Sequence, residues 1–282
     1  MSDRILLVGA TGFLGSFVAR RLAVRGAAAL VRSSSNVAAL PDAMELVRGD
    51  LNADLPLDGF TTVVYCASMG FGQVPPLVRG MQTAGVKRAV FISTTAIFTS
   101  LPSASRTMRL DAELAVQSST LDWTILRPTM IYGTARDRNI SRLLRFLKRW
   151  PVFPLCGNGL WQPIYVEDLA DAVVAVLDSP HTSRRVYNVA GAQPLALADL
   201  VRTAARAVGR DVTLIRVPLR AAVLGSKLTR IVTPEQVRRL AEDKAFSYAD
   251  AARDFGFAPC SFADGVTREA QAMGLSPMRP AV

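Results

Sequence analysis

The chain has 282 residues, half of them hydrophobic, so it can bury a full core and should form one large domain or one domain with a smaller lobe. Its net charge of +10 comes from basic residues, mostly arginine, that are dispersed along the chain, which argues against a nucleic-acid partner. The single histidine, His181, excludes histidine triads, histidine relays and most zinc sites.

Neither a bound metal nor a membrane-spanning segment is expected. Cys66, Cys156 and Cys260 have no metal-type spacing and are odd in number, so we interpret them as reduced thiols. No apolar run approaches the roughly 20 residues that span a bilayer, and the amino terminus lacks the charged-then-apolar pattern of a signal peptide. We therefore expect a cytoplasmic protein.

The first residues predict a strand, a glycine turn and a helix. Ile5–Val8 is a continuous apolar run, typical of a parallel strand covered on both faces, and apolar residues take helical spacing from Phe13 onward. Glycines at this corner allow a positive φ, a pyrophosphate against the backbone and close helix packing. An ordinary corner is the alternative for an isolated match, but this position favours nucleotide binding. The expected cofactor contacts are Gly9, Thr11, Gly12, Phe13, Leu14 and Gly15.

The second and third strands are predicted over Ala27–Val31 and Met44–Val47. Arg32 follows the second strand, where a carboxylate would bind the ribose hydroxyls of NAD; an arginine instead suits a 2′-phosphate, so NADP(H) is favoured. Asp50 and Leu51 follow the third strand. Asp50 is expected at the adenine amino group, and simple turn chemistry explains it equally well.

The fourth and fifth strands, Thr61–Tyr65 and Ala89–Ser93, complete a strand-helix rhythm that predicts a doubly wound parallel sheet of the Rossmann type. Ligands bind such a sheet outside the carboxyl ends of its strands. The fourth strand ends in Cys66, Ala67 and Ser68, and the fifth in Ser93, Thr94 and Thr95. The cofactor contacts expected here are Cys66, Ala67, Ser68 and Ser93, with Pro128 after the sixth strand, whereas Thr94 and Thr95 are expected at the substrate. One hydroxyl could hold a substrate carbonyl, or the hydroxyls could only satisfy backbone groups of the turn.

Downstream, Met108–Gln117 predicts a helix, and Trp123–Leu126 predicts a sixth strand that runs into Pro128 and Thr129. Ile140–Trp150 predicts a basic amphipathic helix. Such a helix can lie on a membrane or a partner, but we favour a cover over an apolar pocket or core. Further helices are predicted over Asp199–Gly209 and from Thr233 onward.

The ordered set of motifs resembles the NAD-dependent epimerase/dehydratase family, the extended and atypical short-chain dehydrogenases/reductases. The motifs are Gly-Ala-Thr-Gly-Phe-Leu-Gly from Gly9, Gly49-Asp50-Leu51, Phe91 through Ala96, Trp123 through Gly133, Pro163 through Ala170, Tyr187 through Gly191 and Phe255 through Pro259. The resemblance covers nearly the whole chain. It implies a Rossmann domain over residues 1–133 and a smaller substrate lobe over residues 134–282, interleaved with the last strands and helices of the Rossmann domain.

The catalytic pair of that family, Tyr-x-x-x-Lys, is missing. Counting back from Glu113, the lysine position falls on Arg109 and the tyrosine position on Ser105. Arginine can bind ribose but donates protons poorly, because its pKa lies above about 12, and an unassisted serine cannot replace a phenol. Thr95 aligns with the substrate-oxygen Ser/Thr of the family. Tyr132 is the remaining candidate acid, with a packing role as its alternative.

The expected substrate residues are Thr94, Thr129, Trp150, Trp161 and Gln162. Trp161 and Gln162 stand where sugar-nucleotide enzymes of the family commonly place an arginine for the diphosphate, so an apolar or aromatic small molecule is favoured. The stretch from Gln162 to Val166 and the loss of the Tyr/Lys pair also resemble the atypical branch around the nucleotide-binding accessory subunit of respiratory complex I. The members of that branch hold NADPH structurally. Relatives in this fold often dimerise through two helices, so a homodimer is a further expectation.

We therefore expect an NADP(H)-dependent oxidoreductase or epimerase that acts on a small, apolar carbonyl or hydroxyl compound. Its proton relay would be non-standard, with Thr95, Tyr132 and Arg109 as the candidate catalytic residues. The alternative is a non-catalytic NADPH-binding sensor or assembly factor.

Overall fold

The computed structural model describes residues 3–53, 55–100, 104–218, 220–221 and 242–276, and the helix expected from Thr233 onward begins outside these ranges. The chain divides into two compact units. Unit 1 comprises residues 1–128, 166–189 and 247–258, and unit 2 comprises residues 129–165, 190–246 and 259–282. Each unit is therefore assembled from segments that are distant in the sequence.

Unit 1 is built on a seven-stranded parallel sheet with the strand order β11-β6-β5-β4-β1-β2-β3. Its strands are β1 (Ile5–Val8), β2 (Ala28–Val31), β3 (Glu45–Arg48), β4 (Thr62–Tyr65), β5 (Arg88–Ile92), β6 (Asp122–Pro128) and β11 (Arg185–Val189). The predicted Rossmann-type α/β fold is confirmed, and β11 extends the six predicted strands to seven. The order reverses between β1 and β4, which is where such sheets bind ligands.

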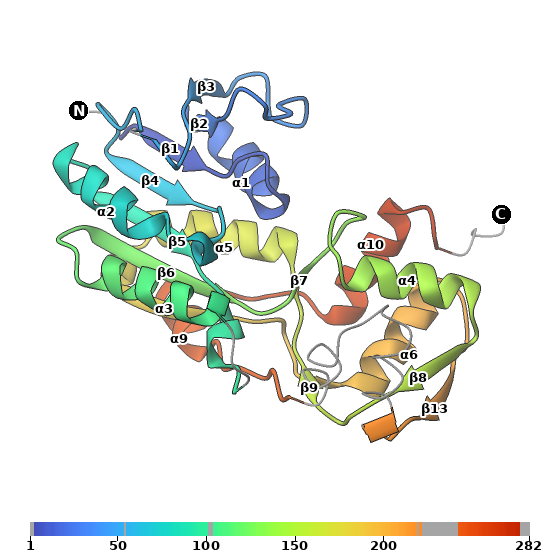
Figure 1. Ribbon diagram of the computed structural model, residues 1–282. Helices are drawn as coiled ribbons and strands as arrows, with labels where there is room; N and C mark the ends of the chain where they lie inside the picture. Colours follow the sequence, from blue (N-terminus) through green and yellow to red (C-terminus); the bar gives the residue numbers. More distant parts are fainter. Residues whose placement is uncertain (1–2, 54, 101–103, 219, 222–241, 277–282) are drawn as a thin grey trace. The chain divides into compact units, whose positions relative to one another are not determined.

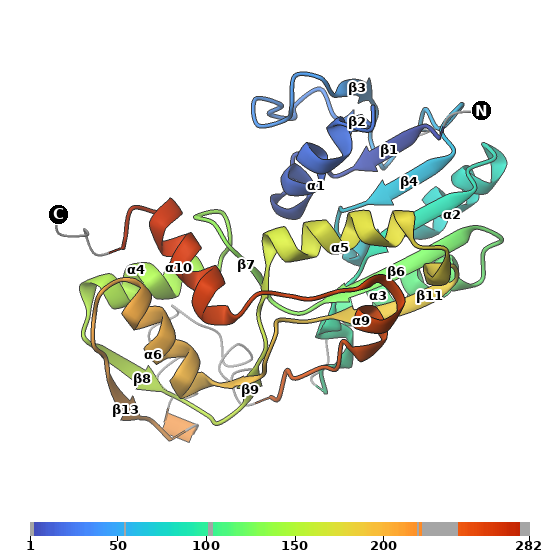
Figure 2. The ribbon, with the colours of Figure 1, turned by 180° about the vertical axis from the view of Figure 1, so that it is seen from behind.

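Helices cover both faces of this sheet (Figures 1 and 2), with α1 beside α5 on one face and α2 and α3 on the other. The helices of unit 1 are α1 (Phe13–Ala23), α2 (Val74–Thr83), α3 (Ala104–Gln117), α5 (Val166–Asp178) and α9 (Ala249–Phe255), with 3₁₀ turns η1 (Met69–Phe71), η2 (Thr95–Phe98) and η3 (Pro180–Thr182). The four residues of β1 are all buried, as an apolar run between two helical layers requires.

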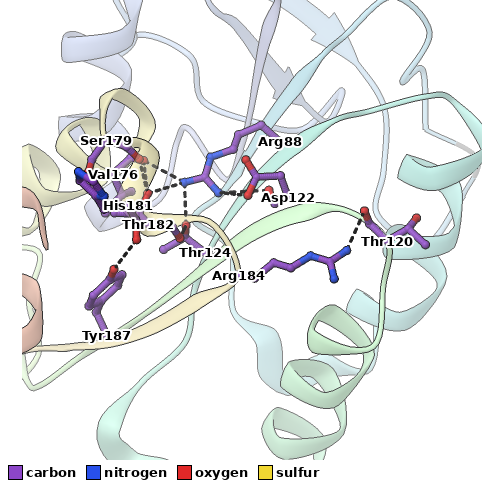
Figure 3. A network of polar contacts seen from close by, with 10 residues as sticks. All are labelled: Arg88, Thr120, Asp122, Thr124, Val176, Ser179, His181, Thr182, Arg184 and Tyr187. Carbon is purple, nitrogen blue, oxygen red and sulfur yellow. Dashed lines mark hydrogen bonds and ion pairs between the residues drawn. The ribbon is translucent and has the colours of Figure 1, made fainter.

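A polar network closes the amino-terminal edge of the sheet (Figure 3). The Arg88 guanidinium donates to Thr124 Oγ1 at 2.7 Å, to the Val176 carbonyl at 2.9 Å and to Thr182 Oγ1 at 2.9 Å, and it pairs with Asp122 at 3.2 Å. Burial lowers the pKa of Arg88, and the charge of Asp122 acts in the opposite direction. The network joins β5, β6, α5 and η3 at the edge opposite the predicted ligand site.

Unit 2 is smaller and contains both helices and short two-stranded sheets. In its described residues the elements are β7 (Ile131–Tyr132), α4 (Ile140–Arg149), β8 (Val152–Leu155), β9 (Leu160–Trp161), β10 (Ile164–Tyr165), β12 (Leu195–Ala196), α6 (Leu197–Ala207), β13 (Thr213–Arg216) and α10 (Phe262–Ala272). The strands pair as β7 with β10, β8 with β13 and β9 with β12. Leu144 of α4, Leu200 of α6 and Val266 of α10 share one core. No helix in the described ranges is both long and apolar enough to cross a bilayer.

Candidate functional site

Gly9 and Gly15, at the glycine turn after β1, have no room for a side chain. Gly9 has φ +84°, and a Cβ atom there would lie 2.8 Å from the backbone nitrogen of Ala67, in the loop after β4. A Cβ atom on Gly15 would lie 1.9 Å from the carbonyl oxygen of Gly9. The turn therefore packs against α1 and against the neighbouring strand's loop, at the point where the strand order reverses.

The amino terminus of α1 lies in this turn. Gly12 is its N-cap residue, so no side chain satisfies the first backbone N–H groups, and the first helical turn contains no acidic residue. Thr11 and Phe13 are half-buried and Leu14 is buried. Free N–H groups and the positive end of the helix dipole make this terminus suited to an anion such as a pyrophosphate.

The loops after β2 and β3 carry the residues expected at the adenosine half of the cofactor. Arg32 is exposed, and its backbone N–H donates to Ser35 Oγ at 3.1 Å, which forms a turn. The Asp50 carboxylate accepts from the backbone and side-chain nitrogens of Asn52, both at 2.9 Å. Turn chemistry therefore occupies Oδ1 of Asp50. Leu51 is half-buried against the core of unit 1.

The loop after β4 turns at once into η1. Ser68 Oγ accepts from the Gly70 backbone N–H at 3.2 Å and so caps this 3₁₀ turn. Burial raises the pKa of the Cys66 thiol to about 12, so Cys66 is a neutral, apolar neighbour rather than a nucleophile. Cys66 and Ala67 are only partly exposed.

The three hydroxyls after β5 differ in what they bind. Thr94 Oγ1 accepts from the Ala96 backbone N–H at 3.1 Å, and Thr95 Oγ1 donates to the Pro128 carbonyl at 3.2 Å. Thr94 thus caps the turn that follows it, and Thr95 binds the end of the neighbouring strand β6. Ser93 is 8 % exposed, and its buried Oγ has no hydrogen-bond partner among the described residues. Buried hydroxyls normally have a hydrogen-bond partner, so Ser93 Oγ is a candidate contact for a ligand.

Helix α3 presents three polar side chains at a spacing of four residues. Arg109 Nη1 donates to Ser105 Oγ at 3.0 Å, and the Arg109 guanidinium lies over Gly70, with Nε 3.4 Å from the position of a Cβ there. One turn further, Glu113 is 2 % exposed and forms an ion pair with Arg127 of β6, which fixes the helix against the sheet. Ser105 was expected to be unassisted, but its hydroxyl accepts from Arg109. Helical spacing of four residues was the signal for this contact.

The structure places Tyr132 in the core of unit 2. The residue is fully buried, its ring packs 5.6 Å from that of Tyr165 and 5.3 Å from that of Phe262, and a Cβ on Gly265 would lie 2.1 Å from its hydroxyl oxygen. Tyr132 therefore has the packing role that was the alternative to a catalytic acid. A hydroxyl enclosed in this way does not reach solvent, so we do not assign Tyr132 an acid role.

Thr129 and Gln162 join separate segments of unit 2. Thr129 Oγ1 donates to the Gln162 carbonyl at 2.5 Å, Gln162 Nε2 donates to the Gly191 carbonyl at 2.7 Å, and Gln162 Oε1 accepts from the Phe246 N–H at 2.8 Å. Both side chains are buried. Their polar groups therefore hold the fold of unit 2, in place of the substrate contacts that were expected.

The two tryptophans expected at the substrate have different surroundings. Trp161 is half-buried, and the Lys244 ammonium lies 3.5 Å from the centre of its ring. Trp150 follows α4, is 53 % exposed and lies beside the Arg149 guanidinium at 5.6 Å. A cavity of about 370 Å³ in unit 2 opens between α6 and α10, and it contains none of the predicted site residues; its lining is Thr203, Arg206, Ala207, Ala263, Thr267, Gln271 and Ser276.

A family model described as NAD(P)H-binding matches residues 9–180, which is more than half of the chain and contains every loop at the carboxyl edge of the sheet from the glycine turn to Pro128. The chain belongs to this NAD(P)H-binding family. This match, together with the UDP-glucose 4-epimerase relative described next, confirms the resemblance to NAD-dependent epimerases and dehydratases.

Several curated proteins are similar to this NAD(P)H-binding chain. UDP-glucose 4-epimerase of Vibrio cholerae is 26 % identical over 81 % of the chain and 83 % of its own length. The alpha subcomplex subunit 9 of mitochondrial NADH dehydrogenase from Arabidopsis thaliana is 28 % identical over 65 % of the chain and 52 % of its own length. Ceramide reductase of Caulobacter vibrioides is 28 % identical over 76 % of the chain and 73 % of its own length.

Solved structures share the fold at low identity. The structure of gox2253 has a TM-score of 0.80 and 21 % identity, with 96 % of this chain and 98 % of that chain covered. The structure of MoeE5 in complex with UDP-glucuronic acid and NAD has a TM-score of 0.75 and 20 % identity, with 96 % of this chain and 99 % of that chain covered. The family model, with the epimerase and reductase relatives, supports a nicotinamide cofactor and an oxidoreductase or epimerase type of chemistry.

Proposed function

We propose that this protein is an NADP(H)-dependent oxidoreductase or epimerase that acts on a small, apolar carbonyl or hydroxyl compound. The observation that carries the proposal is the buried Ser93 hydroxyl at the carboxyl end of β5. This hydroxyl has no hydrogen-bond partner among the described residues. This end lies on the same sheet edge as the glycine turn, where doubly wound folds bind their cofactors.

The residues after β1 and β2 fit a dinucleotide phosphate. The amino terminus of α1, whose N-cap residue Gly12 has no side chain, would bind the pyrophosphate. Because Gly9 and Gly15 also lack side chains, the pyrophosphate could lie directly against the backbone of the turn. Arg32, followed by serines instead of a carboxylate, would bind a 2′-phosphate. When bound, the nicotinamide ring supplies or accepts the hydride.

The hydroxyls after β5 would bind the substrate oxygen. Ser93 Oγ is available to donate to it, whereas Thr95 Oγ1 must first give up its bond to the Pro128 carbonyl. Removing one donor from such a site typically costs 10²–10³ in turnover. Arg109, held by Ser105 over Gly70, would place a permanent positive charge near the ribose or the developing oxyanion. Since a guanidinium retains its proton, the transferred proton comes from water or the substrate.

The apolar character of the substrate has separate support. Gln162, at the position where family members that bind sugar nucleotides commonly carry an arginine, is occupied with backbone groups of unit 2. One relative is a ceramide reductase, whose name denotes a lipid substrate. A second candidate function, a non-catalytic NADPH-binding assembly factor, has support from the missing Tyr/Lys pair and from the NADH dehydrogenase relative. The epimerase and reductase relatives favour the enzyme.

Titration of the purified protein with NADPH and with NADH, followed by the fluorescence of the bound cofactor, tests the cofactor assignment. We expect tighter binding of NADPH and a loss of that preference in Arg32→Ala, because only NADPH carries the 2′-phosphate. A panel of long-chain and aromatic ketones and aldehydes then tests turnover by absorbance at the nicotinamide band. Ser93→Ala should lower kcat with little change in NADPH affinity. Tight binding without oxidation over the whole panel would favour the assembly factor, and no binding would refute the site.

A further inference from the structure

One segment of unit 2 is rich in basic residues and contains no acidic ones. Between residues 138 and 166 the sequence contains Arg138, Arg142, Arg145, Lys148 and Arg149 and no aspartate or glutamate. The four arginines are exposed and Lys148 is half-buried. All but Arg138 belong to α4, whose opposite face is buried in the core of unit 2.

Large apolar side chains are exposed on the same stretch. Phe146 is 38 % exposed, Trp150 is 53 % exposed and Val152 is 39 % exposed. Ile215, 53 % exposed, lies on β13, which pairs with β8. Four of the five large apolar side chains that are strongly exposed in the described part of unit 2 thus belong to α4, its carboxyl end and the adjoining two-stranded sheet, the exception being Leu160. We call these four residues with Arg138, Arg142, Arg145 and Arg149 the α4 surface.

We propose that the α4 surface docks this protein on an anionic phospholipid membrane. Aromatic residues with a polar tip, such as Trp150, favour the headgroup level of a bilayer, and exposed arginines beside them attract anionic headgroups. Phe146, Val152 and Ile215 would lose their exposed apolar area to the acyl boundary. The inference rests on unit 2 alone and does not depend on the reaction proposed for unit 1.

Charge decides between a membrane and a second copy of the chain. Each copy carries a net charge of +10, and a symmetric contact through the α4 surface would place arginines against arginines without a carboxylate in reach along residues 138–166. An anionic bilayer supplies the missing negative charge. It also accepts the aliphatic side chains Val152 and Ile215, which nucleic acid would leave in water.

The test is co-sedimentation of the full-length protein with vesicles of pure phosphatidylcholine and with vesicles that contain 30 % phosphatidylglycerol. We expect strong partitioning only onto the anionic vesicles and a loss of binding in high salt. The double variant Arg142→Gln/Arg149→Gln should reduce partitioning roughly 25-fold, about fivefold for each arginine. The matched control is Leu46→Ala/Arg48→Gln on β3 of unit 1, whose side chains are also exposed and which should bind like the wild type.

Tryptophan emission provides a second readout. Trp150 is the exposed member of the three tryptophans, so anionic vesicles should shift the emission to the blue in the wild type. In Trp150→Phe, which keeps an aromatic ring, partitioning should persist within a few-fold while the shift disappears. Equal partitioning onto neutral and anionic vesicles, equal loss in the β3 control, or binding of duplex DNA in place of vesicles would each overturn the proposal. NADPH affinity, measured in parallel, should stay unchanged in the α4 variants.

Discussion

Glu269 of α10 is a carboxyl group buried where its charge is unfavourable. Its exposed fraction is 0 %, and burial together with the neighbouring Asp137 raises its pKa to about 10. The backbone of Gly133 and the charge of Arg145 lower that pKa but do not compensate. Asp137 Oδ1 already accepts from the N–H groups of Asn139 at 2.9 Å and of Ser141 at 3.1 Å. Oδ2 of Asp137 is therefore left for Glu269, which can donate to it only when protonated.

This arrangement makes the native state lose stability as the pH rises. The ordinary pKa of a glutamate is 4.5, so between this value and about 10 the unfolded chain releases a proton that the native chain retains. The free energy of unfolding then falls by about 1.4 kcal/mol per pH unit. Because the pKa of Glu269 in the native protein lies well above 7, the free energy of unfolding lost by pH 7 depends only on its pKa in the unfolded chain. This loss amounts to about 3 kcal/mol relative to acidic pH.

Glu269→Gln tests this reasoning, because the amide has the shape of the protonated carboxyl, can donate to Asp137 and does not titrate. We expect the variant to be more stable than the wild type at pH 7 by up to about 3 kcal/mol, with the difference small at pH 5 and growing to pH 8. Urea unfolding followed by circular dichroism measures both proteins, and Asp58→Asn, at an exposed carboxylate, is the control. Parallel pH dependence in wild type and Glu269→Gln would refute the buried-acid assignment.

Three further predictions concern unit 1. Arg88→Met should lower the free energy of unfolding by about 3 kcal/mol in urea titrations, because it leaves buried partners of the network unsatisfied. Gly15→Ala should abolish NADPH binding in fluorescence titrations, since its Cβ would overlap the Gly9 carbonyl. Gly80→Ala is the contrasting variant: its Cβ would make an ordinary contact with the Leu57 side chain at 3.4 Å, so it should raise the free energy of unfolding by about 0.5–1 kcal/mol. If the chain dimerises through α3, Leu114→Arg, at a 63 % exposed position, should yield a monomer in light scattering; an unchanged mass would exclude that face.

The sheet of unit 1 was predictable because its strands are short apolar runs between turn residues, and such runs are recognisable one at a time. The steric demands at Gly9 and Gly15 also followed from the sequence, since both act within one strand-turn-helix corner. Strand β11 was missed: its half-buried sequence carries no strong local signal, and it is defined by pairing with β6, from which it is distant in the chain.

The roles of Tyr132, Gln162 and Glu269 were not predictable, because each depends on elements brought together only by tertiary packing. Gly265 makes the space for the Tyr132 hydroxyl, and Phe246 completes the bonds of Gln162. The sequence does contain one signal for Glu269, since it falls at helical spacing from the buried Phe262 and Val266. A carboxylate on the apolar face of a helix is therefore a signal for a buried acid.

The interleaving of the two units constrains how the chain can be synthesised. When the first 128 residues have left the ribosome, β6 is an edge strand with unpaired backbone groups, because β11 and α5 come from residues 166–189. The face of the sheet beside α1 lacks α5 at the same stage. The sheet of the nascent chain thus keeps an unpaired edge and an incompletely covered face until the whole first segment of unit 2, residues 129–165, and then α5 and β11 have been made. A fragment that stops before β11 retains that exposed edge.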